Sequence, residues 1–71
     1  AGGNWYASSE CERAIAALED GKPEEARQRL RTCETAWPFN PEVQRLSARA
    51  ARLVNDYPAA EAHLNRARKL Q

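Results

Sequence analysis

The stretch Trp37-Pro38-Phe39-Asn40-Pro41 divides the chain into two halves that share one helical pattern. Pro38 and Pro41 cannot both lie inside one helix, because each lacks a backbone N–H and its ring clashes with the preceding turn. Asn40 followed by Pro41 is instead typical of a helix start, with asparagine at the capping position and proline in the first turn. We therefore expect one helix to end near Trp37 and the next to begin at Pro41.

The composition favours an all-α fold of a single domain. The 71 residues are rich in alanine, arginine, glutamate and leucine, and β-branched residues are rare. The formal net charge is +1, so no overall field attracts nucleic acid or an anionic membrane. No apolar run approaches the roughly 20 residues that span a bilayer. Ala1-Gly2-Gly3 is typical of a cut end, so we draw no conclusion about targeting from the lack of a signal peptide.

Apolar residues recur at helical spacing in four segments, which predicts four helices after a flexible lead at 1–6. The first begins at Asn4 or at Ser8–Ser9, where Ser9 and Glu12 fit a capping box, and ends at 20–21. The second starts at Pro23, the third spans 41–54, and the fourth has a proline near its start. The expected core stripes are Cys11, Ala14, Ile15 and Leu18; Ala26, Leu30, Cys33 and Trp37; Val43, Leu46, Ala50 and Leu53 or Val54; and Ala60, Leu64, Ala67 and Leu70.

Short connections make consecutive helices antiparallel neighbours, so the chain is predicted to form two helical hairpins. The second helix of each hairpin repeats at a period of 34 residues. The first helices fit this period less well, and their apolar stripes suggest small register shifts in opposite directions. The corresponding pairs are Gly21 and Asn55, Pro23 and Tyr57, Ala26 and Ala60, Leu30 and Leu64, and Cys33 and Ala67.

This repeated unit resembles the tetratricopeptide repeat (TPR), a helix-turn-helix unit of the same length. The turn at 55–60 is similar to the family's Gly-Asp-Tyr-x-x-Ala turn, 21–26 is a weaker copy, and Pro38 matches the proline that closes a repeat. The resemblance covers nearly the whole chain as a domain at 7–71, with repeat one at 7–40 and repeat two at 41–71. It implies that the two hairpins stack in a short right-handed α-solenoid.

Cys11 and Cys33 lie on the facing stripes of the first two helices, at equal distances from the turn at Lys22. Residues placed in this way lie across from each other in an antiparallel hairpin, so the geometry of a disulfide is attainable. Such a bridge stabilises a small core by roughly 3 kcal/mol and implies an oxidising compartment. The alternative is two buried free thiols that act as small apolar side chains.

A row of arginines, Arg45, Arg49 and Arg52, lies opposite the apolar stripe of the third helix. In tetratricopeptide proteins the first helix of each repeat lines a concave, peptide-binding groove. The resemblance therefore places this row beside a groove for an acidic segment or a C-terminal carboxylate. The alternative is a solvated face whose charges pair with Glu42 and Asp56. A second set of arginines is expected on a solvated convex face: Arg27, Arg29 and Arg31.

The aromatic residues lie at the ends of segments. Trp5 and Tyr6 are expected either to pack on the second helix or to form a partner-binding hot spot. Trp37 is expected in the core and Phe39 in the joint between the repeats. No residue pattern supports catalysis, a cofactor or a metal site, because the single histidine, His63, has no second histidine and no zinc-finger spacing to the cysteines.

These observations predict a non-catalytic, monomeric protein-interaction module in the periplasm, and the resemblance of its lead to those of lipoproteins implies a tether to the outer membrane. The resemblance extends to TPR-bearing lipoproteins that activate bifunctional peptidoglycan synthases (penicillin-binding proteins) by docking on their ectodomains. The alternatives are a pilotin-type scaffold of a secretion system, a cytoplasmic adaptor, and a structural element that pairs with another copy through the fourth helix. Nucleic-acid binding and membrane insertion of this segment are not expected.

Overall fold

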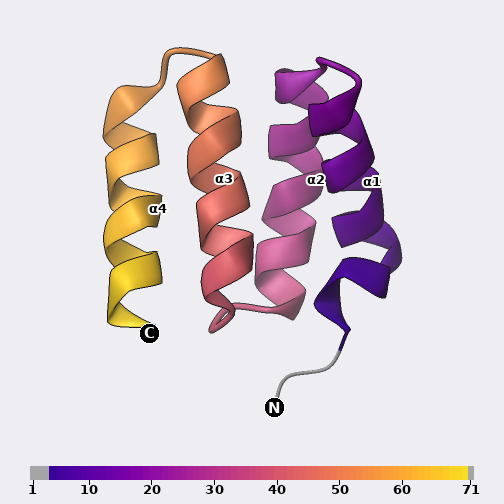
Figure 1. The fold of residues 1–71 in the computed structure, drawn as a ribbon, viewed down its shortest axis with the longest axis horizontal. Coiled ribbons are helices and arrows are strands. Elements are labelled where there is room, and N and C mark those ends of the chain that lie inside the picture. Colours follow the sequence, from indigo (N-terminus) through magenta and orange to yellow (C-terminus); the bar gives the residue numbers. More distant parts are fainter. Residues whose placement is uncertain (1–3, 71) are drawn as a thin grey trace.

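The computed structural model describes residues 4–70, which form four α-helices and one short 3₁₀ helix and contain no strand. Each α-helix packs on the next one in the chain, and Figure 1 shows the four side by side with their connections at alternating ends. The predicted all-α fold of two stacked antiparallel hairpins is therefore confirmed. The elements are η1 (Trp5–Ala7), α1 (Ser9–Glu19), α2 (Pro23–Ala36), α3 (Pro41–Leu53) and α4 (Tyr57–Lys69).

The start of α3 has the predicted cap. The Asn40 side chain accepts hydrogen bonds from the backbone N–H groups of Glu42 and Val43, at 2.9 and 3.3 Å. These bonds satisfy two of the donors that a helix N-terminus leaves free. Asp56 caps α4 in the same way, through the Ala59 N–H.

The capping box predicted at Ser9 and Glu12 was wrong. Ser9 is the first helical residue, and Ser8 occupies the capping position without a side-chain hydrogen bond. The helix begins one residue earlier than predicted. η1 ends at Ala7, and Ser8, whose N–H donates to the Trp5 carbonyl, is shared as the cap of both elements. Of the predicted lead at 1–6, residues 1–3 lie outside the described residues, and the last two belong to η1.

The two hairpin turns have the same backbone geometry. Gly21 and Asn55, 34 residues apart, have φ angles of 72° and 63°, a left-handed conformation that glycine and asparagine tolerate best. The residue after each donates its N–H back to the preceding helix: Lys22 to the Ala17 carbonyl and Asp56 to the Ala51 carbonyl, both at 2.8 Å. The hairpins are therefore related by one period through their turns.

This period also holds in the first helix of each hairpin. Ala14 and Ala48 are both buried, and so are Ala17 and Ala51. The predicted shifts of these first helices away from the 34-residue period were therefore wrong. The apolar stripe of α3 was misleading because this helix packs against both α2 and α4, so more of its surface is buried than one stripe covers. Its stripe residue Leu53 is exposed, whereas Ala48 and Ala51 pack with α4.

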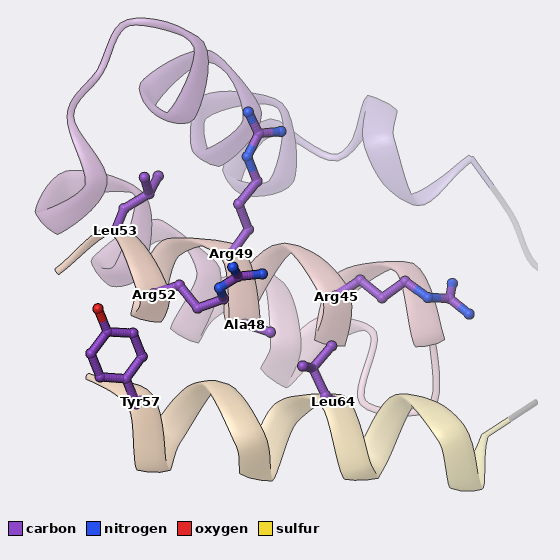
Figure 2. Close-up of a pocket in the computed structure, with 7 residues that line it drawn as sticks. All are labelled: Arg45, Ala48, Arg49, Arg52, Leu53, Tyr57 and Leu64. Atoms are coloured by element: carbon purple, nitrogen blue, oxygen red, sulfur yellow. The ribbon is translucent and has the colours of Figure 1, made fainter. Parts of the chain in front are cut away.

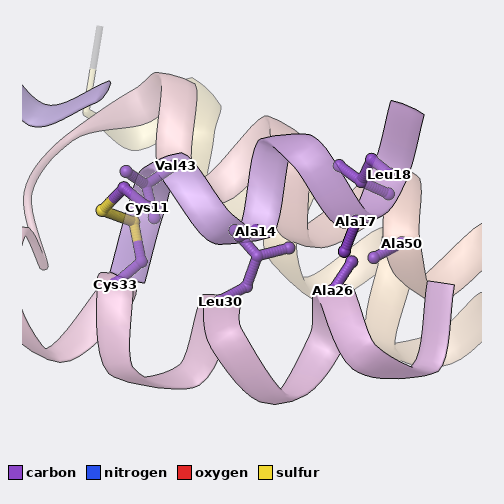
Figure 3. Close-up of a cluster of buried hydrophobic side chains, with 9 residues drawn as sticks. All are labelled: Cys11, Ala14, Ala17, Leu18, Ala26, Leu30, Cys33, Val43 and Ala50. Carbon is purple, nitrogen blue, oxygen red and sulfur yellow. A yellow bond between two sulfur atoms is a disulfide. The ribbon is translucent and has the colours of Figure 1, made fainter. Parts of the chain in front are cut away.

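The main core lies between α1, α2 and α3, with a smaller cluster between α3 and α4. Alanines let the helices approach closely, and Leu30 fills the space between them (Figure 3). Trp5 and Trp37 pack against the main core, as predicted for Trp37. The buried members of the main core are Cys11, Ala14, Ala17, Leu18, Ala26, Leu30, Cys33, Val43 and Ala50.

The predicted disulfide is confirmed. Cys11 of α1 and Cys33 of α2 are bonded, with their Cα atoms 5.0 Å apart, and both are fully buried (Figure 3). The bridge joins the two helices at the end of the hairpin that is remote from its turn. The disulfide therefore holds the start of α1 to the end of α2, which no turn connects.

Candidate functional site

Arg45, Arg49 and Arg52 line one groove between α3 and α4. They occupy the remaining face of α3 because its other faces are buried against α2 and α4. The groove has a volume of ≈ 440 Å³. In Figure 2, Arg45 extends along α3 near Leu64 and Arg52 extends along α3 toward Ala48, whereas Arg49 extends away from α4. The lining residues are Arg45, Ala48, Arg49, Arg52, Leu53, Tyr57 and Leu64.

The three arginines differ in their pairing. Arg45 pairs with Glu42, one turn away on the exposed surface of α3. Arg49 and Arg52 form no ion pair and no side-chain hydrogen bond with any residue between 4 and 70. Asp56, the second carboxylate expected to neutralise the row, points to α2 instead, where it accepts a 2.9 Å hydrogen bond from Arg27. Two of the three charges are therefore free to meet a ligand.

The expected convex face of arginines on α2 was wrong for two of its three members. Arg27 bonds across to the turn before α4, and Arg29 pairs with Glu10 of α1 at 3.3 Å. Sequence spacing does not reveal these pairs because each joins residues that are far apart along the chain. Of these three arginines, only Arg31 is exposed.

Exposed apolar side chains complete the groove, and no sequence pattern marks them as part of a site. Leu53, Tyr57 and Leu64 are 53%, 61% and 39% exposed. Leu53 and Leu64 were assigned to core stripes because the pattern alone cannot show which helix face lacks a neighbour. The available signal is the repeat, which places Leu64 at the position of Leu30 in the other hairpin.

Trp5 and Tyr6 do not line this groove. They lie in η1, where their rings meet edge to face with centroids 5.9 Å apart. Trp5 packs against the core, whereas Tyr6 is exposed. Phe39, expected to pack in the joint between the hairpins, is 82% exposed, because the loop between α2 and α3 turns its ring outward into solvent. These aromatic residues are thus separate from the arginine groove.

A polar network links α2, α3 and α4 on the side of Glu34. Gln44, which is buried, donates from Nε2 to Glu34 Oε2 at 2.7 Å. Since a carboxylate only accepts, the Gln44 Oε1 atom faces His63 Nδ1, 2.8 Å away, and the histidine donates. Arg66 of α4 also donates to Glu34, at 3.3 Å.

We expect the folded state to lose stability as the pH falls below about 6.5, through His63. Burial lowers the pKa of His63, and the neighbouring Glu34 carboxylate opposes this only in part. A histidine whose pKa is lower in the folded chain is protonated first in the unfolded chain. The contribution of His63 to the free energy of unfolding is therefore fully present above its pKa in the unfolded chain. It declines as the pH falls from that value toward the lower pKa of the folded chain.

The measurement is the free energy of unfolding in urea at pH 7.5 and 5.5. His63→Gln has no such proton to take up, so its loss of stability between the two pH values is expected to be smaller than that of the wild type. Equal losses in the two proteins would show that His63 does not set this pH dependence.

Residues 4–70 assemble neither a serine activated by a histidine nor a group of three potential metal ligands. Ser47 and His63 line a cavity of ≈ 50 Å³, but the buried Ser47 hydroxyl has no hydrogen-bond partner among residues 4–70. The hydrogen bond that activates a nucleophilic serine is therefore missing. Residues 4–70 also hold no cluster of three potential metal ligands. The non-enzymatic character of the chain stays a prediction.

Comparison of the chain with protein-family models, curated proteins and solved structures gives no match. The resemblance to tetratricopeptide repeats therefore stays a prediction. None of the helices described between residues 4 and 70 combines the length and the apolar character needed to cross a membrane.

Proposed function

We propose that this chain is a non-catalytic protein-interaction module that binds an acidic segment of a partner in the arginine groove. The observation that supports the proposal is the meeting of three arginines and three exposed apolar side chains in one groove. Arginine recognises carboxylates with directional hydrogen bonds, and the apolar surface adds contact area. A surface of this kind favours a protein ligand over a small metabolite because the groove is open and its three charges are spread along α3.

The biological setting of the proposal follows from two features. The 34-residue period and the matching turns support a tetratricopeptide-type repeat, and the disulfide is compatible with an oxidising compartment such as the periplasm. In its specific form, the chain is part of a lipoprotein tethered to the outer membrane that activates a peptidoglycan synthase by docking on its ectodomain. A pilotin-type scaffold and a cytoplasmic adaptor are the alternative settings of the same groove.

The general proposal is tested by selecting peptides from a random phage-displayed library. Selection is run on the wild-type chain, with the Arg45→Glu, Arg49→Glu and Arg52→Glu triple variant as the counter-target. We expect the retained peptides to carry two or more Asp or Glu within eight residues. Their binding should weaken as salt rises, because exposed charges are screened. Enrichment of peptides without acidic residues, or no enrichment over the variant, would contradict the proposal.

The specific partner is tested by direct binding of a purified synthase ectodomain to the immobilised chain. We expect binding that the triple variant loses and that Arg31→Glu, a charge reversal on the exposed face of α2, retains. No binding to the wild type would remove the synthase as the partner. Binding that both variants retain would move the site away from the groove.

A further inference from the structure

The two equivalent leucines of the hairpins have different environments. Leu30 of α2 is 2% exposed because α3 covers it, and it shares one buried cluster with Val43 and Ala50 of α3. Leu64 of α4, the same residue 34 positions later, is 39% exposed. Within residues 4–70 no helix lies on α4 in the way that α3 lies on α2. Leu64 thus marks a surface with the form of a helix-binding groove.

The lining of this groove differs in charge from its counterpart in the first hairpin. Carried back by one period, Arg45, Arg49 and Arg52 correspond to Cys11, Ile15 and Leu18. Two of those residues are buried in the core that α3 completes, and the third is partly buried. In the second hairpin Ala48 and Leu64 still give the groove apolar surface, but the three positions equivalent to Cys11, Ile15 and Leu18 carry positive charge. An occupant of the second groove therefore needs carboxylates where α3 needs none.

The arrangement of the arginines also specifies how acidic and apolar residues should be spaced on a helix that binds in the groove. The three arginines follow one another at intervals of four and three residues along α3, which spans about 10 Å of helix. Val43 and Ala50, the α3 residues that cover the first groove, are seven residues apart. A helix that lies on α4 as α3 lies on α2 would place small apolar residues seven apart over Leu64. Its carboxylates would lie beside that stripe, at spacings of four and three.

We propose that the groove between α3 and α4 binds a helical segment of a partner protein, with acidic residues at i, i+4 and i+7 facing the arginines. This inference rests on the proposed function and adds that the acidic segment is a helix rather than an extended strand. The charge of the groove favours a foreign acidic helix over symmetric pairing with a second copy, because such pairing would bring the arginines of two α3 helices together.

The probe is a synthetic peptide of roughly 18 residues, three turns longer than the arginine row needs. It carries glutamates at i, i+4 and i+7 beside alanines seven apart, and a lactam bridge on the opposite face holds it helical. One control peptide has the same composition with the glutamates spread around the helix. The other replaces a central residue of an unbridged version by proline, which breaks the helix but keeps the acids.

Binding is followed by NMR amide shifts of the isotope-labelled 71-residue chain. We expect the helical peptide to shift the amides of Ala48, Arg52 and Leu64 and to bind at least about tenfold more tightly than both controls. Arg52→Glu should weaken it at least about tenfold, and Arg31→Glu, which changes the net charge equally, should not.

The contrary outcomes are distinct. Equal binding by the proline peptide at the same amides would overturn the helical inference and leave the acidic groove standing. A lack of groove shifts with all three peptides would overturn both proposals. A dimer in sedimentation that Leu64→Asp dissociates would assign the groove to a second copy and overturn the foreign partner.

Discussion

Replacing both Cys11 and Cys33 by alanine is expected to lower the free energy of unfolding by about 3 kcal/mol. The disulfide closes a loop with a sequence separation of 22, which limits the conformations open to the unfolded chain. Both cysteines are also fully buried, so the lost sulfur atoms leave space in the core. A core of this size supplies only a few kcal/mol, so the variant should be largely unfolded at 37 °C.

The measurement is urea unfolding followed by circular dichroism at 222 nm. The wild type under a phosphine reductant is the control, since it keeps the sulfur atoms and loses only the covalent link. We expect its loss to be somewhat smaller than that of the double variant, because the sulfur atoms still fill the core. A loss below about 1 kcal/mol in both would contradict the role of the disulfide as the main staple of the first hairpin.

Leu30→Ala is expected to cost about 2–4 kcal/mol of stability, because Leu30 is almost fully buried where three helices meet. The chain provides its own matched control. Leu64→Ala makes the same change at the equivalent position of the second hairpin, where the side chain is partly exposed. We expect it to cost less than about 1 kcal/mol, because little apolar area is lost from the interior.

The comparison is made by urea unfolding of both variants under the same conditions. Equal losses would mean that Leu64 is covered in solution, for example by another copy of the chain. The groove between α3 and α4 would then not be open, and the proposed binding site would be wrong. A large difference supports the view that α3 buries one leucine and leaves its counterpart exposed.

Local signals in the sequence were sufficient for the four α-helices and for the disulfide, although not for η1 or the cap of α1. Asn40 and Pro41 specify the start of α3 through the cap and the proline ring, which act within one turn. Cys11 and Cys33 could be paired because a hairpin with a short turn places residues symmetrically about Lys22. Each of these inferences depends on residues close to one another along the chain or joined by a single turn.

Features that depend on the packing of separate helices were missed. Leu53 and Leu64 follow the apolar period of their helices, but no local pattern shows which side of the last hairpin lacks a neighbour. Asp56 was expected near the arginine row only in the alternative of a solvated face, yet it pairs with Arg27 of α2, far away along the chain. The site thus emerged only in part, as three arginines without the apolar side chains that complete the groove.

The most direct test of the central claim is a double-mutant cycle between Arg52 and the glutamate of the helical peptide that faces it. Dissociation constants are measured for the wild type, Arg52→Ala, the peptide with that glutamate replaced by glutamine, and the two changes together. We predict a coupling free energy of at least about 1 kcal/mol, as for close charge pairs at interfaces. Additive effects, within about 0.5 kcal/mol, would show that the arginine and the carboxylate do not meet in the groove, and would contradict the account.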